Sequence, residues 1–201
     1  MEIDIYALLT IINKEYQRIS MHGIRRELLL AQAQSLSIPL VEVSIPKRAT
    51  NVEYENAMRE AMLPLISQGI DAVVFGDIFL EDVRRYREEK LAAVELKAVF
   101  PLWGEKTKDL ASEFIHRGFK ARIACVDTHN MDAAFAGREF DHALMNDLPK
   151  NIDPCGENGE FHTFVYDAPI FSQPVPFKMG DVVLRDDRFC FCDFLQPGED
   201  L

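Results

Sequence analysis

The sequence contains no long apolar run and no recognisable targeting segment. No stretch of its 201 residues approaches the roughly 20 apolar residues that a membrane-spanning helix needs. The N-terminal stretch "MEIDIYALLTIINKEY" lacks the basic segment and the cleavage site of a signal peptide. We therefore expect a cytoplasmic protein that has no membrane partner.

Positive charge is also scarce. Lys and Arg number 22 against 33 Asp and Glu, which gives a net charge of -11 at pH 7. A chain with this balance repels phosphate backbones, and it carries no local basic patch longer than a few residues. We expect no nucleic-acid partner.

Cysteine is too rare for a disulfide scaffold. The chain has 4 cysteines, unevenly spaced. Cys190 and Cys192 form a Cys-x-Cys pair, and residues two apart in a strand share one face. Because no second Cys or His pair stands at zinc spacing, we favour buried strand thiols over a metal site and predict no metal ligands.

The first half of the chain alternates apolar runs of strand length with helical patterns. The strand-like runs cover residues 4–12, 39–45 and 71–76, and helical spacing of apolar residues fills 23–38 and 51–70. Helices between apolar strands imply right-handed crossovers and a parallel sheet. We therefore predict an α/β fold in which helices cover both faces of a parallel sheet.

The second half changes character. The pattern predicts helices at 82–94, 107–117 and 137–147, strands at 97–103 and 120–126, and paired strands at 181–187 and 188–195. A Pro-, Asn- and Gly-containing loop fills 148–159. We place a domain boundary near Trp103, which divides the chain into residues 1–103 and a smaller α+β domain at 104–201.

Ligands of open parallel sheets bind beyond the carboxyl ends of the strands. Gly76 and Asp77 follow the apolar run "AVVF" and are the best candidates for such a position. An ordinary glycine turn, with Asp77 capping the next helix, explains the same residues equally well. His22 lies between the first strand and the first helix and is a marginal candidate at the same edge.

The stretch "DPCGENGEFHTFVYDAPIF", residues 153–171, is denser in polar groups. If Phe161–Tyr166 is a strand, its period of two places Glu160 and His162 on one face. Asp167 then lies at the far end. Such a group could orient an ammonium, a hydroxyl or a metal-bound ligand, or it could be a loop that enters a strand with both side chains merely hydrogen-bonded.

Three segments, in this order and spacing, resemble the diphthine-ammonia ligase family: "VVFGDIFLEDVRRYREE", "VFPLW" and "CGENGEFHTFVYDAPIF". The family is a branch of the PP-loop ATP pyrophosphatases in the HUP nucleotide-binding superfamily. The form "GDIFLEDVRRYREE" looks closer to bacterial relatives than to the archaeal and eukaryotic ligases. The likeness runs from about Tyr6 to Phe171. It implies a Rossmann-like N-terminal domain that binds ATP and a C-terminal domain that binds the acceptor.

The resemblance also implies a reaction and the residues for it. ATP, with Mg²⁺, adenylates a carboxylate on a small molecule or a protein, and ammonia then displaces AMP to leave an amide. The Cys-Gly-Glu-x-Gly-Glu motif corresponds to Cys155–Glu160, so we predict Glu157 and Glu160 as catalytic. The predicted substrate-binding residues are Gly156, Asn158, Gly159, His162, Thr163 and Asp167. The predicted nucleotide-side residues are Gly76, Asp77 and His22.

One departure from the family pattern concerns the phosphates of ATP. The family begins with a strand and a Ser-Gly-Gly-Lys-Asp-Ser loop, which binds phosphates on backbone N–H groups. The 10 glycines of this sequence include no adjacent pair, and Met1 aligns with the start of the family's second strand. Either the chain is a shortened version of an ATP-dependent ligase, or it is a non-catalytic module that binds a small ligand or a protein. A sheet edge left by a missing strand makes a homo-oligomer possible.

Overall fold

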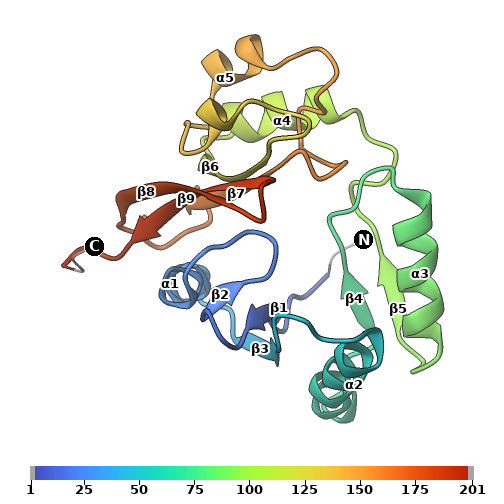
Figure 1. Cartoon of the computed structure of the whole chain (residues 1–201). Coiled ribbons are helices and arrows are strands. Elements are labelled where there is room, and N and C mark those ends of the chain that lie inside the picture. The colour runs from blue at the N-terminus through green and yellow to red at the C-terminus, as the bar shows by residue number, and fades with distance from the viewer. Residues whose placement is uncertain (1–2, 199–201) are drawn as a thin grey trace.

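The computed structural model describes residues 3–198 of the chain and contains helices and three β-sheets (Figure 1). In chain order the elements are β1 (Leu8–Asn13), β2 (Arg18–Ile19), α1 (Arg26–Leu36), β3 (Leu40–Ile45), α2 (Asn51–Ser67), β4 (Ala72–Val74), α3 (Glu81–Ala92), β5 (Lys97–Val99), α4 (Thr107–His116), β6 (Lys120–Asp127), the 3-10 helix η1 (Ala133–Phe135), α5 (His142–Asp147), β7 (Phe161–Asp167), β8 (Lys178–Arg185) and β9 (Phe189–Leu195). No helix among the described residues is long and apolar enough to cross a membrane.

The first half contains two parallel strand pairs joined by helices. β1 and β3 run parallel, with Leu8 opposite Leu40 and Asn13 opposite Ile45, and α1 connects them. β4 and β5 also run parallel, and α3 connects them. The predicted α/β alternation with parallel pairing is therefore confirmed.

The parallel strands do not form the single sheet that we predicted. The order of the first sheet is β2-β1-β3, whereas β4 and β5 form a separate two-stranded sheet. Figure 1 shows the two sheets apart, with β1 and β3 on one side and β4 and β5 on the other. Within residues 3–198 no strand joins the two sheets. The second edge of β1 pairs only with the short strand β2, at Ile12 and Asn13, and β4 pairs with β5 alone.

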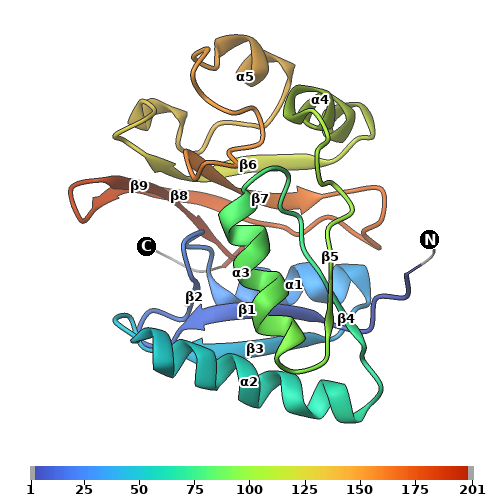
Figure 2. The same cartoon turned by 90° about the vertical axis from the view of Figure 1, so that its right-hand side faces the viewer.

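The C-terminal half is built on an antiparallel sheet of order β7-β6-β9-β8. Figure 2 shows the layers from bottom to top: α2, the β1–β3 sheet, α1, the four-stranded sheet, and then α4 with α5. The predicted hairpin of the final two strands is confirmed as β8 and β9. Cys190 and Cys192 are buried free thiols on β9, as the sequence favoured.

The helix that we predicted over residues 137–147 is wrong in its first half. Gly137 has a left-handed backbone with φ of 82°, and its N–H donates to the carbonyl of Ile123 on β6. Phe140 donates to Ala121 in the same way. The segment therefore pairs with β6, and α5 begins only where the Asp141 carboxylate accepts the N–H of Leu144 at 2.8 Å.

Helix α1 packs on the C-terminal sheet. Ile24 and Leu28 share a buried cluster with residues of that sheet and of the segment before β8. The members from the second half are Ala124, Phe164, Val175, Cys192 and Phe194. The cluster thus crosses the predicted boundary near Trp103, and the boundary itself stays a prediction.

Candidate functional site

The loop of residues 153–160, called here the Cys-Gly-Glu loop, is folded by its own carboxylates. Asp153 Oδ2 accepts the backbone N–H groups of Cys155 and Glu157, each at 3.0 Å. Gly156 has φ of 69°, and a Cβ atom there would lie 2.7 Å from the carbonyl oxygen of Phe161. A side chain at position 156 is therefore excluded by both backbone conformation and space.

Glu160 is buried, with 4% of its surface exposed. Its Oε1 accepts the N–H of Asp153 at 3.0 Å and the side-chain amide of Asn158 at 2.9 Å. Its Oε2 accepts the backbone N–H of Asn158 at 3.0 Å. Both carboxylate oxygens thus close the Cys-Gly-Glu loop, and the catalytic role of Glu160 stays a prediction beside this observed structural one.

Glu157 joins the Cys-Gly-Glu loop to the loop that follows β4. Its Oε1 accepts the backbone N–H of Ile78 at 2.6 Å and that of Phe79 at 3.4 Å. These are the residues directly after Gly76 and Asp77. The structure therefore brings the two sequence-predicted halves of the site into contact through one carboxylate.

The Asp77 side chain turns away from this contact. It forms an ion pair with Arg87 of α3 at 3.0 Å, and 11% of its side-chain surface is exposed. The Arg87 guanidinium also lies over the ring of Phe75, 4.3 Å from its centroid. Asp77 thus fastens the end of β4 to α3, and its predicted place beside a nucleotide stays untested.

His22 and His162 are in ring contact, with centroids 4.5 Å apart. Burial, followed by the neighbouring His22, lowers the pKa of His162 to about 4. Burial also lowers the pKa of His22, against the opposing effect of its contact with the Ser20 carbonyl. Both imidazoles are therefore neutral near pH 7. In the sequence the position of His22 at a strand edge was a signal for a site, but nothing linked His22 to His162.

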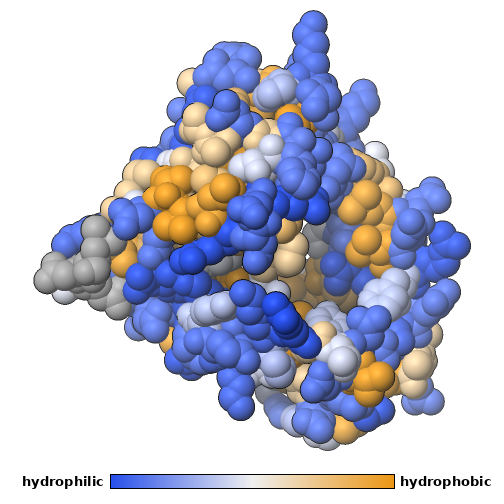
Figure 3. Space-filling view, in the orientation of Figure 1, coloured by the Kyte–Doolittle hydropathy of each residue, from blue (hydrophilic) through white to orange (hydrophobic). Residues whose placement is uncertain are grey.

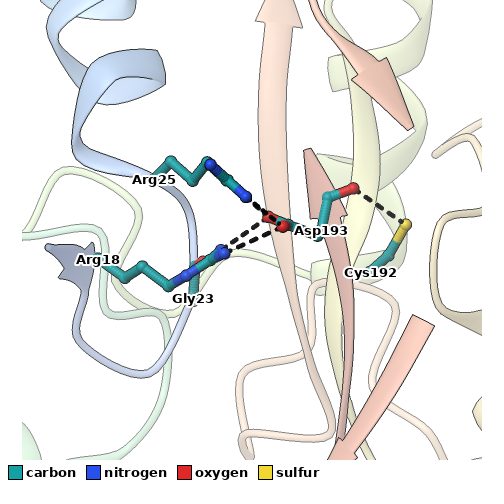
Figure 4. Close-up of polar contacts among 5 residues, drawn as sticks. All are labelled: Arg18, Gly23, Arg25, Cys192 and Asp193. Carbon is teal, nitrogen blue, oxygen red and sulfur yellow. Dashed lines mark hydrogen bonds and ion pairs between the residues drawn. The ribbon is translucent and has the colours of Figure 1, made fainter. Parts of the chain in front are cut away.

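The segment of residues 18–25, called here the His22 loop, is fastened to β9 by an acidic clamp (Figure 4). Asp193 accepts two hydrogen bonds from Arg18, at 2.8 and 3.0 Å, and two from Arg25, at 3.2 and 2.8 Å. Burial alone would raise the pKa of Asp193, but the bonds from Arg25 and Arg18 outweigh it and lower the pKa to about 2. Gly23 has φ of 72°, and a Cβ there would lie 2.5 Å from the Phe191 ring.

Sequence reasoning missed this clamp. Arg18 and Arg25 are separated from Asp193 by 175 and 168 residues. Arg18 and Arg25 lie in polar segments that look like ordinary surface, and Asp193 is a single acidic residue within the apolar strand β9. Only the packing of α1 on the four-stranded sheet brings them together, and a single sequence gives no signal for that contact.

The remaining predicted residues lie along β7. Thr163 stands opposite Ile123 of β6. Asp167 forms an ion pair with Lys120 at 3.0 Å. Since five residues of extended strand span roughly 17 Å, Asp167 is far from His162 and is not brought into the same cluster.

A cavity of about 660 Å³ opens beside the His22 loop. The β1–β2 turn lines one side, and the β8–β9 hairpin lines the other. Its polar lining includes Arg18, Ser20, Lys47 and Asp193. Among residues 3–198 no group of three or more His, Cys, Asp and Glu side chains could hold a metal ion.

Comparison with known proteins gives the family. The model of the diphthamide synthase C-terminal domain matches residues 106–187. A diphthine–ammonia ligase of Danio rerio is 31% identical over 183 residues, which cover 82% of this chain and 71% of the relative. The Homo sapiens diphthine–ammonia ligase is 25% identical over 198 residues, covering 90% of this chain and 72% of the relative. The resemblance of the sequence motifs is thereby confirmed, and the chain belongs to the diphthine–ammonia ligase family.

Proposed function

We propose that the protein is an ATP-dependent ligase that adenylates a carboxylate and transfers ammonia to it, forming an amide. The relatives are named as ligases for diphthine and ammonia. The observation that carries the proposal is the contact of Glu157 with the N–H groups of Ile78 and Phe79. It holds the Cys-Gly-Glu loop against the carboxyl end of β4, where an α/β sheet binds its ligand.

We further propose that the two parallel strand pairs are parts of one Rossmann-like sheet of the HUP type. Both pairs have the parallel direction and the helical crossovers that this fold requires. Figure 3 shows the molecule hollowed near its centre, in the region where Figure 1 places the space between β1 and β4. A strand between β1 and β4 would pair with the free edge of β4 and with the part of the β1 edge that β2 leaves open.

The chain's own residues supply the acceptor side of this reaction. Asp153 and Glu160 hold the Cys-Gly-Glu loop in shape. Within residues 3–198 the second carboxylate oxygen of Glu157 accepts no hydrogen bond, so it can orient an ammonium ion or the acceptor. His162 is neutral at pH 7, so it can hydrogen-bond the acceptor without adding a charge to the site. ATP supplies the activation when bound, because adenylation gives the carboxylate a good leaving group.

The chain has residues that could contact only part of an ATP molecule. Gly76 at the end of β4 and the neutral His22 could border the nucleotide. The phosphates have no such residues, since the sequence contains no adjacent glycines that could form a phosphate-binding loop. No step at the phosphates is therefore assigned to this chain, and Mg²⁺ belongs to the proposal only as a companion of ATP.

The acceptor that we propose is a carboxylate on a small molecule or a protein, and the second substrate is ammonia. The net charge of -11 argues against a nucleic-acid substrate. We propose the cytoplasm as the compartment, in keeping with free thiols at all four cysteines.

AMP release is the test. We would compare the 201-residue chain with a version that carries a designed N-terminal strand and a Ser-Gly-Gly-Lys-Asp-Ser loop. The control has the same extension with the Gly-Gly-Lys segment replaced by alanines. We expect AMP release only from the intact extension, increased by ammonium and a carboxylate acceptor. An intact extension that neither binds nor hydrolyses ATP would refute the ligase proposal.

A second candidate is a non-catalytic module that holds a small cationic or amide ligand, or a protein, at the surface from Glu157 to Asp167. This candidate describes what the 201 residues can bind by themselves, since they include no adjacent glycines for a phosphate-binding loop. Calorimetry on the 201-residue chain separates the two candidates. Micromolar affinity for ATP contradicts the binding module, whereas no affinity for ATP favours it.

A further inference from the structure

Strand β8 is an open edge of the C-terminal sheet. It is the last strand in the order β7-β6-β9-β8 and has eight residues, Lys178–Arg185. Within residues 3–198 its pairing is with β9 alone, and no backbone hydrogen bond from another described segment reaches its outer edge. The outer edge therefore presents unpaired N–H and C=O groups to any strand that can align with it.

The exposed side chains of β8 are unusual for a free edge. Val182 and Leu184 are each 52% exposed, and Met179 is 50% exposed. Figure 3 shows apolar surface left of centre, on the side of the molecule where β8 and β9 lie. Soluble proteins commonly protect a free edge with lysine, proline or a charged side chain that points inward. β8 begins with Lys178 and has a register shift between Met179 and Val182, but beyond this shift it offers the aliphatic side chains of Val182 and Leu184, which gain stability when another surface covers them.

The sequence of β8 complements itself. In an antiparallel pair centred on Val183, Asp181 of one copy lies opposite Arg185 of the other, and Val182 lies opposite Leu184. Two-fold symmetry repeats each match, which gives two opposite-charge pairs and two aliphatic pairs. A shift by one residue would place Asp181 opposite Leu184 and Arg185 opposite Gly180, and so lose both charge pairs. We propose that the protein forms a homodimer through antiparallel pairing of β8 with β8 of a second copy.

The pairing joins the two four-stranded sheets into one sheet across the two-fold axis. Because side chains alternate along a strand, Val182 and Leu184 of both copies meet on one face, and the charged pairs lie on the other. The interface is closed, since the same strand serves both partners and no edge of β8 remains free. This dimer is independent of the ligase proposal and uses a different edge from those of β1 and β4.

Sedimentation equilibrium tests the dimer. We expect the wild-type chain to approach twice its 23.0 kDa mass, with a dissociation constant of about 0.1 mM or tighter. Arg185→Asp replaces both attractive pairs by repulsive ones and should raise the dissociation constant about tenfold or more. Asp181→Arg combined with Arg185→Asp reverses the pairs and should restore the wild-type value. Lys108→Asp, an equal change of charge at an exposed position of α4, should have no effect.

Cysteine cross-linking tests the register. Opposite Cβ atoms of a strand pair lie about 4.5–5.5 Å apart, so Val183→Cys should form a disulfide-linked dimer with its own copy. Leu184→Cys should not, because its opposite residue is Val182. A wild-type chain that stays monomeric at 0.1 mM overturns the proposal, as does a double charge reversal that fails to restore the dimer or equal cross-linking of the two cysteine variants.

Discussion

Replacing Asp193 with asparagine should release the His22 loop from β9. Asp193→Asn keeps the size of the side chain but removes the negative charge that holds Arg18 and Arg25. One oxygen of the carboxylate also becomes an NH₂ group, which donates and so cannot accept a bond from a guanidinium. Both arginines would then lie part-buried with their main partner weakened.

The size of the effect follows from the pKa of Asp193. Its side chain is 18% exposed, and its pKa falls from 3.8 to about 2. At 1.36 kcal/mol per pKa unit, this difference corresponds to roughly 2.5 kcal/mol of folding free energy at pH 7. For a chain of this size we expect the melting temperature to fall by roughly 5–10 °C.

The contribution of Asp193 to folding stability should decrease as the pH falls. Because the pKa of Asp193 is lower in the folded than in the unfolded chain, its contribution is fully present above about pH 4 and is lost as the pH falls through about 2. The stability gap between wild type and Asp193→Asn should therefore shrink to roughly half at pH 3. Urea unfolding at pH 7, 4 and 3 measures this gap directly.

Asp82→Asn is the matched control. Asp82 pairs with Arg85 at 3.4 Å, but 99% of its side chain is exposed. Exposed ion pairs contribute little, so this variant should unfold like wild type at every pH. The reasoning is refuted if Asp193→Asn is as stable as wild type at pH 7, or if its deficit is the same at pH 3.

Three other predictions concern the site. Gly23→Ala should cost roughly 1–3 kcal/mol in urea unfolding, because φ is 72° and the new Cβ would lie 2.5 Å from the Phe191 ring; wild-type stability would contradict this. Glu157→Gln should keep the Ile78 amide protected in hydrogen exchange, whereas Glu157→Ala should expose it, since only the former retains an acceptor; equal exchange in both would count against the contact. His162 should titrate by NMR with a pKa near 4; a pKa of 6 or above would contradict its burial.

The sequence predicted most of the helices and strands, but it did not predict which strands pair with one another. Apolar runs and helical spacing located the strands and helices of the first half, because both patterns are local. The division into two sheets depends on which strand edges meet, and no local pattern encodes that. The predicted start of a helix at Gly137 is wrong for the same reason, because Gly137 donates its N–H to the carbonyl of Ile123 on β6, a residue distant in the sequence pattern.

The sequence predicted most residues of the candidate site, but it did not predict which of them contact one another. The motif resemblance picked out Glu157 and the neighbourhood of Gly76, and the structure joins them through Ile78. Which side chain would turn into the contact could not be read from the sequence: Asp77 turns toward α3 instead. The acidic clamp of Arg18, Arg25 and Asp193 could not be predicted from the sequence, because it forms only when α1 packs against β9.

Substitutions of Glu160 and of Glu157, the two glutamates of the Cys-Gly-Glu motif, test different properties of the site. Glu160 uses both oxygens to accept bonds within the loop, so even glutamine would point an NH₂ group at a donor and disturb the fold. Loss of activity in a Glu160 variant would thus follow from a structural role alone. Glu157 accepts through one oxygen, which glutamine can replace. Comparing Glu157→Gln with Glu157→Ala therefore separates the charge of this carboxylate from its contact with Ile78.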